Sequence, residues 1–332
     1  MLKMAVVGMG IGGSHGAKIH AGDVGELTAI CDRDAEKLKW RLETYAKEID
    51  AHPTGYEDFD AMLSAEALDG VVVATPSGTH HALAVAAARR GVNVLVDKPL
   101  DVTVEHIDLI DRAVADAGVL CGVNYQMRFG AGYRAVKKAI DAGAFGRLLM
   151  VDVRLKWFRD QAYYDRGGWR GTWAMDGGGS LMNQGAHPMD LLVWYAGRPR
   201  KVRGDFAALN HDIETEDWAA GVIEFDSGAR SVVSTTTNVT LGDDVGKKAD
   251  RVWLEVHGTA GSAFLLDGKV VETNVAGLDD PPAPEYADPV ADFMAAIRDR
   301  RPAEVTIEQG RWSVQLIAAV YESARTGQAI EL

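Results

Sequence analysis

The chain has 332 residues, 47% of them apolar and 25% charged, a composition typical of a folded globular protein long enough for two domains. Its net charge of −13, with no basic stripe to offset it, argues against binding to nucleic acid or to an anionic membrane. No apolar run approaches the roughly 20 residues that span a bilayer.

The N-terminus and the cysteines indicate where the protein works. The chain begins with a strand-like apolar run and not with a signal peptide and cleavage site. Cys31 and Cys121 both end apolar runs, so we expect them to be buried free thiols. Together these features predict a protein of the reducing cytoplasm.

A glycine-rich turn follows the first expected strand, residues 4–8. Gly8, Gly10 and Gly13 fit the pattern G-x-G-x-x-G, with a strand before it and an expected helix, residues 14–21, after it. Glycines at this spacing permit a tight turn and let the backbone approach a pyrophosphate, and the N-terminus of the helix favours the anion. The turn therefore predicts a dinucleotide site, with Gly8, Gly10, Ile11 and Gly13 as binding residues.

The second expected strand, Leu27–Cys31, ends in Asp32, 19 residues after Gly13. An acidic residue at about this distance typically accepts hydrogen bonds from the adenosine ribose hydroxyls. Its charge would repel the 2′-phosphate of NADP, so NAD is the predicted cofactor. Arg33 and Lys37 stand close enough to soften that preference and leave NADP open. A solvated loop aspartate is the alternative interpretation of Asp32.

Helices and apolar strands alternate up to residue 123 and predict a doubly wound parallel sheet of about six strands. Ligands of such sheets bind at the carboxyl ends of the strands. The run Gly70–Ala74 ends in three candidate cofactor contacts, and the next helix opens with a fourth: Thr75, Pro76, Ser77 and His80. The strand Val92–Val96 leads to Lys98, a candidate catalytic and cofactor-binding residue, although lysines also end strands for structural reasons.

Polar and aromatic residues at 124–129 break the apolar rhythm and mark the expected domain boundary. We therefore expect a dinucleotide-binding domain over residues 1–123 and a substrate-binding and oligomerisation domain over residues 124–332. Gln126, in the boundary turn, is a further candidate for cofactor binding.

The second half of the chain predicts a mostly antiparallel sheet with helices. Strands are expected at Leu148–Trp157, Trp218–Phe225, Arg230–Val239, Val252–His257 and Ala263–Leu266. One face of this sheet needs helices as cover. The other face, on which we place Val233, Val252 and Leu254, would be open, and self-association is the simplest way to cover it. A loop is expected over Asp279–Pro289, and two helices over Val290–Arg300 and Ile307–Thr326.

An aromatic and glycine-rich loop spans residues 163–173. Tyr163, Arg170 and Trp173 suit a pocket for a hydroxylated ligand, because aromatic rings stack on sugar faces and the three polar groups donate hydrogen bonds. The alternative is a glycine-rich connection whose aromatic side chains fill core.

The stretch Asp176–Asp190 contains an amide, Asn183, a histidine, His187, and a carboxylate, Asp190, at helical spacing. If it is helical, the three side chains share one face. Pro188 allows this only in a first turn or at a kink. The stretch predicts either a polar site or a histidine that makes one structural hydrogen bond. We expect Asp190 to be structural.

The motifs GMGIGG, ATPSGTHH, VDKP, NYQMRF and GGGSLMNQGAH together resemble the Gfo/Idh/MocA oxidoreductases over essentially the whole chain. The resemblance implies a Rossmann domain followed by an α/β domain with a large open, mostly antiparallel sheet, often used to form dimers or tetramers. It also implies NAD(P)-dependent redox chemistry on a sugar or polyol carbon. The lysine of the family E-K-P motif falls on Lys98 and the helix histidine on His187. Asp97 replaces the family glutamate, and Asn183 replaces the aspartate four residues before the histidine.

The expected reaction is hydride transfer between the nicotinamide and a secondary alcohol of a cyclic sugar, sugar derivative or inositol. Lys98 and His187 would share the acid–base work, and Asn183 would orient. Without the family aspartate, we expect Lys98 to lose its proton more readily. The expected substrate-binding residues are Lys98, Tyr163, Arg170, Trp173, Asn183 and His187, and no metal is expected.

Two other functions stay open from the sequence: an NAD-dependent glycoside hydrolase with transient oxidation, and a non-catalytic regulator that senses NAD(P). The expected assembly is a homodimer or homotetramer formed through the C-terminal sheet. Nothing in the sequence selects the sugar or its carbon.

Overall fold

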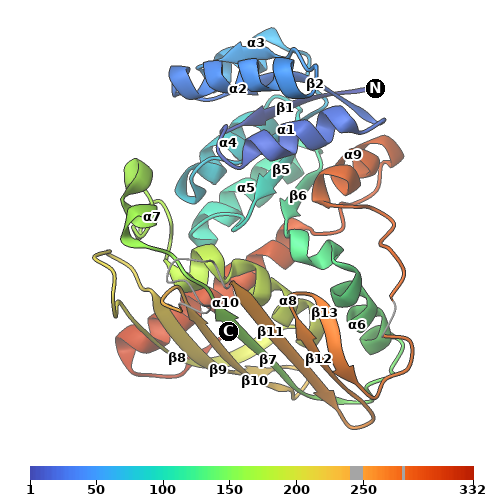
Figure 1. Cartoon of the computed structure of the whole chain (residues 1–332), viewed down its shortest axis with the longest axis vertical. Helices are drawn as coiled ribbons and strands as arrows, with labels where there is room; N and C mark the ends of the chain where they lie inside the picture. Colours follow the sequence, from blue (N-terminus) through green and yellow to red (C-terminus); the bar gives the residue numbers. More distant parts are fainter. Residues whose placement is uncertain (240–249, 279–280) are drawn as a thin grey trace. The chain divides into compact units, whose positions relative to one another are not determined.

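The computed structural model describes residues 1–239, 250–278 and 281–332, so the expected loop Asp279–Pro289 begins at two positions outside the described residues. Contacts between Cα atoms divide the chain into two compact units (Figure 1). The first contains residues 1–124 and 286–308, and the second contains residues 125–285 and 309–332. The expected boundary lay after residue 123 and assigned residues 286–308 to the second domain.

The first unit is built on a six-stranded parallel sheet in the order β3-β2-β1-β4-β5-β6. The order reverses at β1, so right-handed crossovers place the helices that connect β1 to β3 on one face and those that connect β4 to β6 on the other. The strands are β1 (Leu2–Val7), β2 (Gly25–Cys31), β3 (Thr54–Tyr56), β4 (Gly70–Val73), β5 (Asn93–Asp97) and β6 (Cys121–Asn124).

Short polar side chains start several helices of this unit. Asp34 accepts a hydrogen bond from the backbone N–H of Lys37, and Asp58 accepts one from Ala61, which satisfies N–H groups that lack a partner within the helix. The helices are α1 (Gly12–Ala21), α2 (Ala35–Glu48), α3 (Phe59–Ala65), α4 (His80–Ala88), α5 (Val104–Ala117) and α9 (Pro289–Asp299).

The core of the first unit explains why residues 286–308 belong to it. Val290, Phe293 and Met294 of α9 are buried in one apolar cluster with Met4 and Ile30 of the sheet. Cys31 and Cys121 are buried free thiols, as predicted, and burial raises the pKa of each to about 12.

The second unit contains an eight-stranded sheet in the order β13-β12-β11-β7-β10-β9-β8-β14. Its neighbours are antiparallel except for β7 and β10, which pair in parallel. Together with the parallel sheet of the first unit, this confirms the predicted fold class. The strands are β7 (Leu148–Lys156), β8 (Pro199–Ala207), β9 (Trp218–Phe225), β10 (Arg230–Thr236), β11 (Arg251–Gly258), β12 (Ser262–Leu266), β13 (Lys269–Thr273) and β14 (Ile330–Glu331).

Helices cover one face of this sheet and lie behind the strands in Figure 1. An added Cβ on Gly204 of β8 would lie 2.6 Å from the carbonyl oxygen of Val320, so glycine lets helix α10 approach the sheet closely. The helices of this unit are α6 (Ala131–Asp141), α8 (Ala186–Ala196) and α10 (Ile307–Thr326), with the short α7 (Gln161–Asp165) in a loop outside this layer.

The side chains expected on the open face of the sheet are on the other face. Val233, Val252 and Leu254 are buried, at 0%, 3% and 0% exposure, so that expectation was wrong. Because strand side chains alternate in direction, the open face carries the neighbouring positions, including Val222 and Val232. Among the described residues, no helix is long and apolar enough to cross a membrane.

Candidate functional site

The glycine turn after β1 has the form of a phosphate cradle. Gly8 has a φ of +93°, and an added Cβ would lie 2.5 Å from the carbonyl oxygen of Ala74, so this position requires glycine. At Gly10, an added Cβ would meet no heavy atom of the described residues within 4 Å. The backbone at Gly10 is therefore open to a ligand, and α1 begins directly after Ile11. This arrangement fits a pyrophosphate at a helix N-terminus.

Asp32 lies beside this cradle, at the end of β2. Its Oδ2 accepts hydrogen bonds from the backbone N–H of Met9 at 2.7 Å and from Lys37 Nζ at 3.2 Å, while Oδ1 accepts one from Asp34 N–H at 3.0 Å. A carboxylate held next to the glycine turn fits a ribose with free hydroxyls. Arg33 is exposed beside it.

The loop after β4 is fixed by His80 and Thr75. Thr75 Oγ1 lies 2.7 Å from Thr79 Oγ1, and Ser77 is buried. His80 is 1% exposed, and its two ring nitrogens lie 2.9 Å from the carbonyl oxygen of Thr75 and 3.0 Å from that of Pro99. His80 therefore connects the loops that follow β4 and β5. Its assignment as a cofactor contact, like those of Thr75, Pro76 and Ser77, stays a prediction.

Lys98 follows β5 and lies next to a network built on Asp97. Asp97 Oδ1 accepts hydrogen bonds from Asn124 Nδ2 and from Lys98 N–H, both at 2.9 Å, and Asp97 Oδ2 lies 3.7 Å from His15 Nε2. Burial alone would raise the pKa of Asp97. The hydrogen bond and charge of His15, with the charges of Lys98 and His80, outweigh burial and hold this pKa below its usual range. Lys98 thus has a carboxylate counter-charge in its own unit, which our expectation of a readily lost proton overlooked.

In the second unit, a buried glutamate fixes the polar stretch. Residues 180–184 form a π-helical turn directly before α8. Glu216 accepts hydrogen bonds from the backbone N–H groups of Gly179 and Leu181, at 2.8 and 2.7 Å, and from the hydroxyl of Tyr321 at 3.0 Å. An added Cβ at Gly179 would lie 2.0 Å from the Glu216 carbonyl oxygen. Burial raises the pKa of Glu216, although these hydrogen bonds oppose the rise.

Asn183 ends up inside a chain of hydrogen bonds. Its Nδ2 lies 2.5 Å from Oδ1 of Asp176, a carboxylate with 0% exposure. Its Oδ1 accepts a hydrogen bond from Gln184 Nε2 at 3.2 Å, and the same Nε2 donates to the hydroxyl of Tyr163 at 2.8 Å. The structure therefore connects two predicted site residues, Asn183 and Tyr163, through Gln184.

His187 lies in the first turn of α8 with 6% exposure. Pro188 occupies the same first turn, where proline is compatible with a helix, so the condition stated for the helical stretch is met. The Tyr125 ring lies edge-on to the His187 imidazole, with centroids 5.9 Å apart. Histidine and amide are thus buried in consecutive helical segments.

The loop at 163–173 gives its three predicted residues different surroundings. The Arg170 guanidinium lies 4.8 Å from the ring centroid of Tyr163 and 4.5 Å from that of Trp169. Trp173 packs edge-on against Phe206 and Tyr321, which is the core-filling alternative for this side chain. Its role in substrate binding stays a prediction that these contacts do not favour. Gln126 is exposed, and its cofactor role also stays a prediction.

Asp190 has a buried ion-pair partner. Arg128 donates from Nε to Oδ2 at 2.7 Å and from Nη2 to Oδ1 at 2.6 Å, and both side chains are 1% exposed. Arg128 Nη1 donates to Gln309 Oε1 at 2.9 Å. Asp190 thus anchors α8, in agreement with the structural role expected for it.

His81, Asp101 and His106 have metal-like spacing, with ligand atoms within 4.8 Å of one another. Asp101, however, already accepts four hydrogen bonds, from the backbone N–H of His81 and Val102 and from Nδ1 of both histidines. The imidazoles stack with centroids 3.7 Å apart at 26°, and a ring Nδ1 that donates to Asp101 has no lone pair to offer a metal. This pattern is that of a closed hydrogen-bond cluster.

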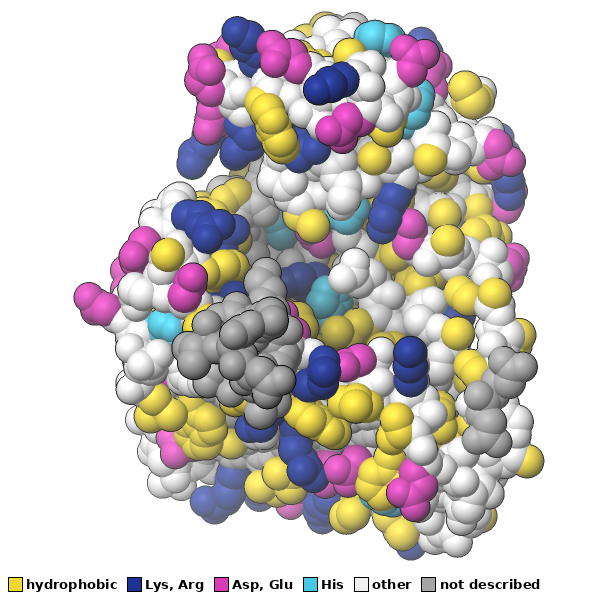
Figure 2. All heavy atoms as spheres, viewed as in Figure 1, with side chains coloured by type: hydrophobic (Ala, Val, Ile, Leu, Met, Phe, Trp, Pro, Cys, Tyr) yellow, Lys and Arg dark blue, Asp and Glu magenta, His cyan; other side chains and the backbone are white. Residues whose placement is uncertain are grey.

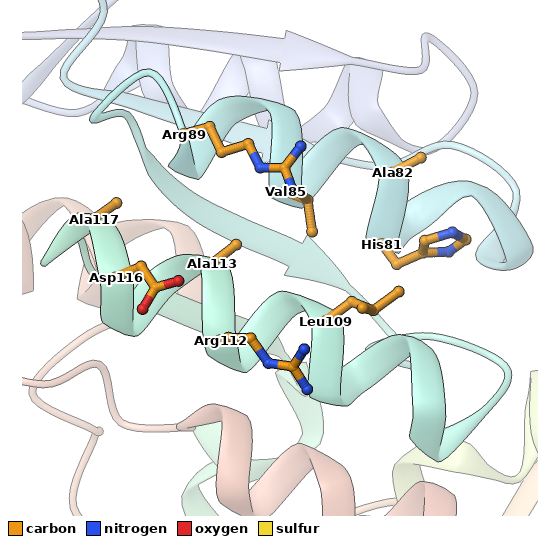
Figure 3. A pocket seen from close by; sticks show the side chains of 9 residues that line it. All are labelled: His81, Ala82, Val85, Arg89, Leu109, Arg112, Ala113, Asp116 and Ala117. Carbon is orange, nitrogen blue, oxygen red and sulfur yellow. The ribbon is translucent and has the colours of Figure 1, made fainter.

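A hollow of about 430 Å³ lies between α4 and α5, as Figure 3 shows. Alanine, valine and leucine line it, with Arg89, Arg112 and Asp116 at its edges and His81 at one end. Of the described residues that line it, none belongs to the predicted site, so we do not assign the reaction to this hollow.

A doubly wound parallel sheet, a glycine cradle after β1 and a buried acid after β2 define a dinucleotide-binding protein of the Rossmann class. Two family models match the chain: the NAD-binding Rossmann fold of the oxidoreductase family over residues 2–125, and the GFO/IDH/MocA C-terminal domain over residues 133–264. The chain belongs to the Gfo/Idh/MocA oxidoreductases, as the motifs predicted.

Named relatives act on polyols and sugars. The scyllo-inositol 2-dehydrogenase (NAD⁺) of Bacillus subtilis is 29% identical over 80% of this chain and 73% of its own length. The 1,5-anhydro-D-fructose reductase of Ensifer adhaerens is 29% identical over 93% and 91%. The WlbA dehydrogenase of Bordetella pertussis, solved with NADH and UDP-GlcNAcA, is 32% identical, with a TM-score of 0.88 and coverage of 100% and 98%.

Sequence reasoning overlooked several residues of the site. Asp176 and Glu216 lie outside the motifs, and Gln184 lies inside GGGSLMNQGAH without being marked there as a partner of Asn183. The one available signal was the position of Asp176, immediately before three glycines and seven residues from Asn183. His15 lies two residues after the glycine fingerprint, but its contact with Asp97 depends on the parallel sheet.

Proposed function

We propose that the protein oxidises a secondary alcohol on a cyclic sugar, sugar derivative or inositol with NAD⁺, or catalyses the reverse reduction. The observation that carries this proposal is the placement of Asn183 and His187 in consecutive buried helical segments of a chain with a dinucleotide cradle. An imidazole that is neutral near pH 7 is a suitable acceptor for a hydroxyl proton.

Each polar residue has a role in this proposal. NAD⁺, when bound, accepts the hydride. His187 takes the hydroxyl proton through its ring nitrogen, and Lys98 donates a hydrogen bond to the same substrate oxygen. Asp97 keeps a negative charge beside Lys98, and Asn183 orients the alcohol. Gly10 and Asp32 hold the pyrophosphate and the adenosine ribose.

The substrate, in this proposal, carries an anionic group. Arg170 lies between two aromatic rings and forms no ion pair with a carboxylate among the residues that the structure describes. Such a guanidinium is suited to a carboxylate or phosphate on a sugar. The complex of the WlbA dehydrogenase with UDP-GlcNAcA, an acidic nucleotide sugar, supports this choice.

Turnover with a panel of substrates tests both the proposed dehydrogenase reaction and the proposed anionic group on the substrate. NADH formation is followed with inositols, neutral sugars, sugar acids, and the matched pair UDP-GlcNAcA and UDP-GlcNAc, each with NAD⁺ and NADP⁺. We expect steady NADH accumulation and a preference for the acidic member of a pair. Turnover of neutral substrates alone would contradict the anionic group. If NADH binds but no substrate is turned over, the result would contradict the proposed dehydrogenase function and favour the non-catalytic regulator that senses NAD(P).

Accumulated NADH also distinguishes the hydrolase alternative, because a transient oxidation returns the nicotinamide to its starting state in every cycle. Release of a free sugar from a glycoside without net NADH would establish that alternative instead.

Variants of Lys98 and His187 test the acid–base roles. Lys98→Met and His187→Asn should each lower kcat by about 10²–10⁴-fold, the usual contribution of a positioned acid or base. If both groups act on one oxygen, the double variant should lose much less than the product of the single losses. His52→Asn, at a side chain with 69% exposure, is the matched control. A Lys98→Met enzyme within about tenfold of the wild type would remove Lys98 from proton transfer.

We also propose that the chain assembles as a homodimer or homotetramer through the open face of its eight-stranded sheet. The support is the apolar side chains on that face: Met150, Val222 and Val232 are 43%, 53% and 54% exposed.

A further inference from the structure

We propose that Asp176 is a positioning residue for the reaction, acting through Asn183. By holding the amide nitrogen of Asn183, it determines which end of that amide can accept hydrogen bonds from the reacting groups. This inference rests on the proposed dehydrogenase function and adds to it a residue outside the two motifs that contain Lys98, Asn183 and His187.

The geometry places Asp176 in a fixed position. It is 0% exposed, and its Oδ2 accepts a hydrogen bond from the backbone N–H of Gly171 at 2.8 Å. Its Oδ1 lies 2.5 Å from Asn183 Nδ2. One carboxylate oxygen is therefore held by the backbone and the other by the amide of Asn183.

The chemistry of the pair decides how Asn183 is turned. The amide nitrogen of Asn183 can only donate and Oδ1 of Asp176 accepts, so the NH₂ group of Asn183 is the end that faces Asp176. The carbonyl end, Oδ1, is then on the other side, where it accepts from Gln184 Nε2 at 3.2 Å. A carbonyl oxygen has two lone pairs and accepts from hydroxyl or ammonium donors, so this orientation directs an acceptor, and not a donor, to that side. A hydrogen bond donated by the NH₂ group polarises the amide, which makes Oδ1 a better acceptor.

Asp176 and Glu216, two buried carboxylates of this region, differ in the groups that they hold. Glu216 binds backbone N–H groups of the π-helical turn and the hydroxyl of Tyr321. Its contacts determine where the turn lies. Asp176 holds one backbone N–H group, that of Gly171, with Oδ2, and its other oxygen reaches the side chain of a predicted catalytic residue. A change at Oδ1 can therefore alter the chemistry while the bond to Gly171 is kept.

The test exchanges the two side chains. In Asp176→Asn, the new Oδ1 can still accept from Gly171, but its NH₂ faces the NH₂ of Asn183. Asn183 should then rotate and present a donor where it had presented an acceptor. We expect kcat to fall roughly tenfold or more, in the range of a misplaced catalytic group, with substrate KM changed less than about threefold. The double variant D176N/N183D restores an acceptor at position 183 and should recover kcat to within about threefold of wild type.

A second readout does not depend on turnover. In the wild type, the side-chain NH₂ resonance of Asn183 should be shifted downfield by its bond to a buried carboxylate, and this shift should be lost in Asp176→Asn. Thermal unfolding and NADH affinity of each variant show whether the fold and the cofactor site are intact.

Every outcome has a clear meaning. A kcat for Asp176→Asn within about twofold of wild type, or a folded double variant no faster than the single one, would overturn the proposal. If Asp176→Asn does not fold, the kcat of the double variant D176N/N183D relative to wild type tests the proposal by itself. Failure of both to fold assigns Asp176 a purely structural role. A wild type without turnover contradicts the proposed function, whereas an active wild type with an equally active Asp176→Asn contradicts this inference only.

Discussion

Asp32 combines a structural and a recognition role in one carboxylate. Two backbone N–H groups, of Met9 and Asp34, hold it beside the glycine turn, and Lys37, which is 42% exposed, is its ion-pair partner. Asp32→Asn keeps an acceptor for Met9 but removes the charge that repels a 2′-phosphate. We expect the Kd for NAD⁺ to rise about tenfold and the Kd for NADP⁺ to fall, since Arg33 and Lys37 stay in place.

Titration calorimetry with both cofactors measures this change. Lys37→Ala is the matched control and should weaken NADP⁺ binding in the Asp32→Asn background. An unchanged ratio of the two affinities in Asp32→Asn would show that Asp32 does not select the cofactor.

Asp97 should make stability depend on pH in the acid range. Its pKa in the folded protein lies below the value of about 3.9 in an unfolded chain. Its contribution to the free energy of unfolding is therefore fully present above that value and is lost as pH falls through the lower folded value. Asp97→Asn, which cannot titrate, should lower stability by about 1–3 kcal/mol at pH 7.

Thermal unfolding from pH 7 to pH 2 checks this, with Asp50→Asn, at a side chain with 95% exposure, as control. The difference between wild type and Asp97→Asn should shrink below about pH 4. A difference that is constant over the whole range would mean that Asp97 does not titrate as its surroundings indicate.

Single residues of the site were predictable only where a local pattern carries them. Gly8 and Asp32 follow from the spacing of strand, turn and strand, and Lys98 and His187 from the family motifs. Asp176 and Gln184 could not be recognised, because their contacts with Asn183 depend on a π-helical turn and on the path of the loop at 163–173. Neither the π-helical turn nor the path of this loop produces a hydrophobic periodicity that can be recognised in the sequence.

The π-helical turn before α8 depends on Glu216. Glu216→Ala would leave the buried N–H groups of Gly179 and Leu181 without their acceptor, at about 1–3 kcal/mol for each group. We expect this variant to unfold at lower temperature and to lose activity, because Asn183 is in the same turn. Glu216→Gln keeps an acceptor and should be milder.

The pH dependence of Glu216 has the opposite sign to that of Asp97. Burial raises its folded pKa above the unfolded value, so the folded state holds the proton more tightly. Its contribution is most favourable below the unfolded value of about 4.3 and decreases as pH rises through the folded one. Denaturant unfolding of wild type and Glu216→Gln across this range measures it. An identical pH profile for the two proteins would refute the assignment.

Elements were predictable where apolar periodicity is strong. The buried runs of β4 and β5 and the alternating pattern of β9 and β10 were recognised. Strand β3 has only three residues and no buried one, while β8 carries four charged residues among its nine and buries only Pro199 and Val202. Their strand state comes from pairing with β2 and β9, which the local sequence does not contain.

At the scale of the whole chain, two kinds of sheet follow from two kinds of pattern. Continuous apolar strands alternating with helices specified the parallel sheet, and period-two strands specified the mixed one. The direction of this alternation was assigned wrongly, because Val233, Val252 and Leu254 were expected on the open face and are buried. Alternation shows that two faces differ but does not show which face the helices cover. The assignment of residues 286–308 to the second domain failed for a related reason. The apolar face of α9 shows that the helix packs against a sheet but does not show which of the two sheets it packs against.

The open face of the eight-stranded sheet should be the assembly surface. Val222 and Val232 are cross-strand partners on it, and ion pairs such as Arg154–Glu255 and Arg200–Glu224 lie around them. Figure 2 shows apolar side chains interspersed with charged ones in this region. Apolar positions framed by ion pairs are the pattern of a protein interface with a polar rim. The double substitution V222E/V232E should therefore dissociate the wild-type oligomer into monomers, since two buried carboxylates per protomer would face each other without partners.

Light scattering after size-exclusion chromatography measures the mass of each protein. Trp40→Glu on α2, at a residue with 54% exposure, introduces the same charge on the first unit and should leave the mass unchanged. A monomeric wild type at micromolar concentration, or a V222E/V232E variant of unchanged mass, would contradict assembly through this face. If the variant is monomeric and keeps its affinity for NADH, the dinucleotide site is complete within one chain, because every residue of the glycine cradle and Asp32 belongs to a single unit.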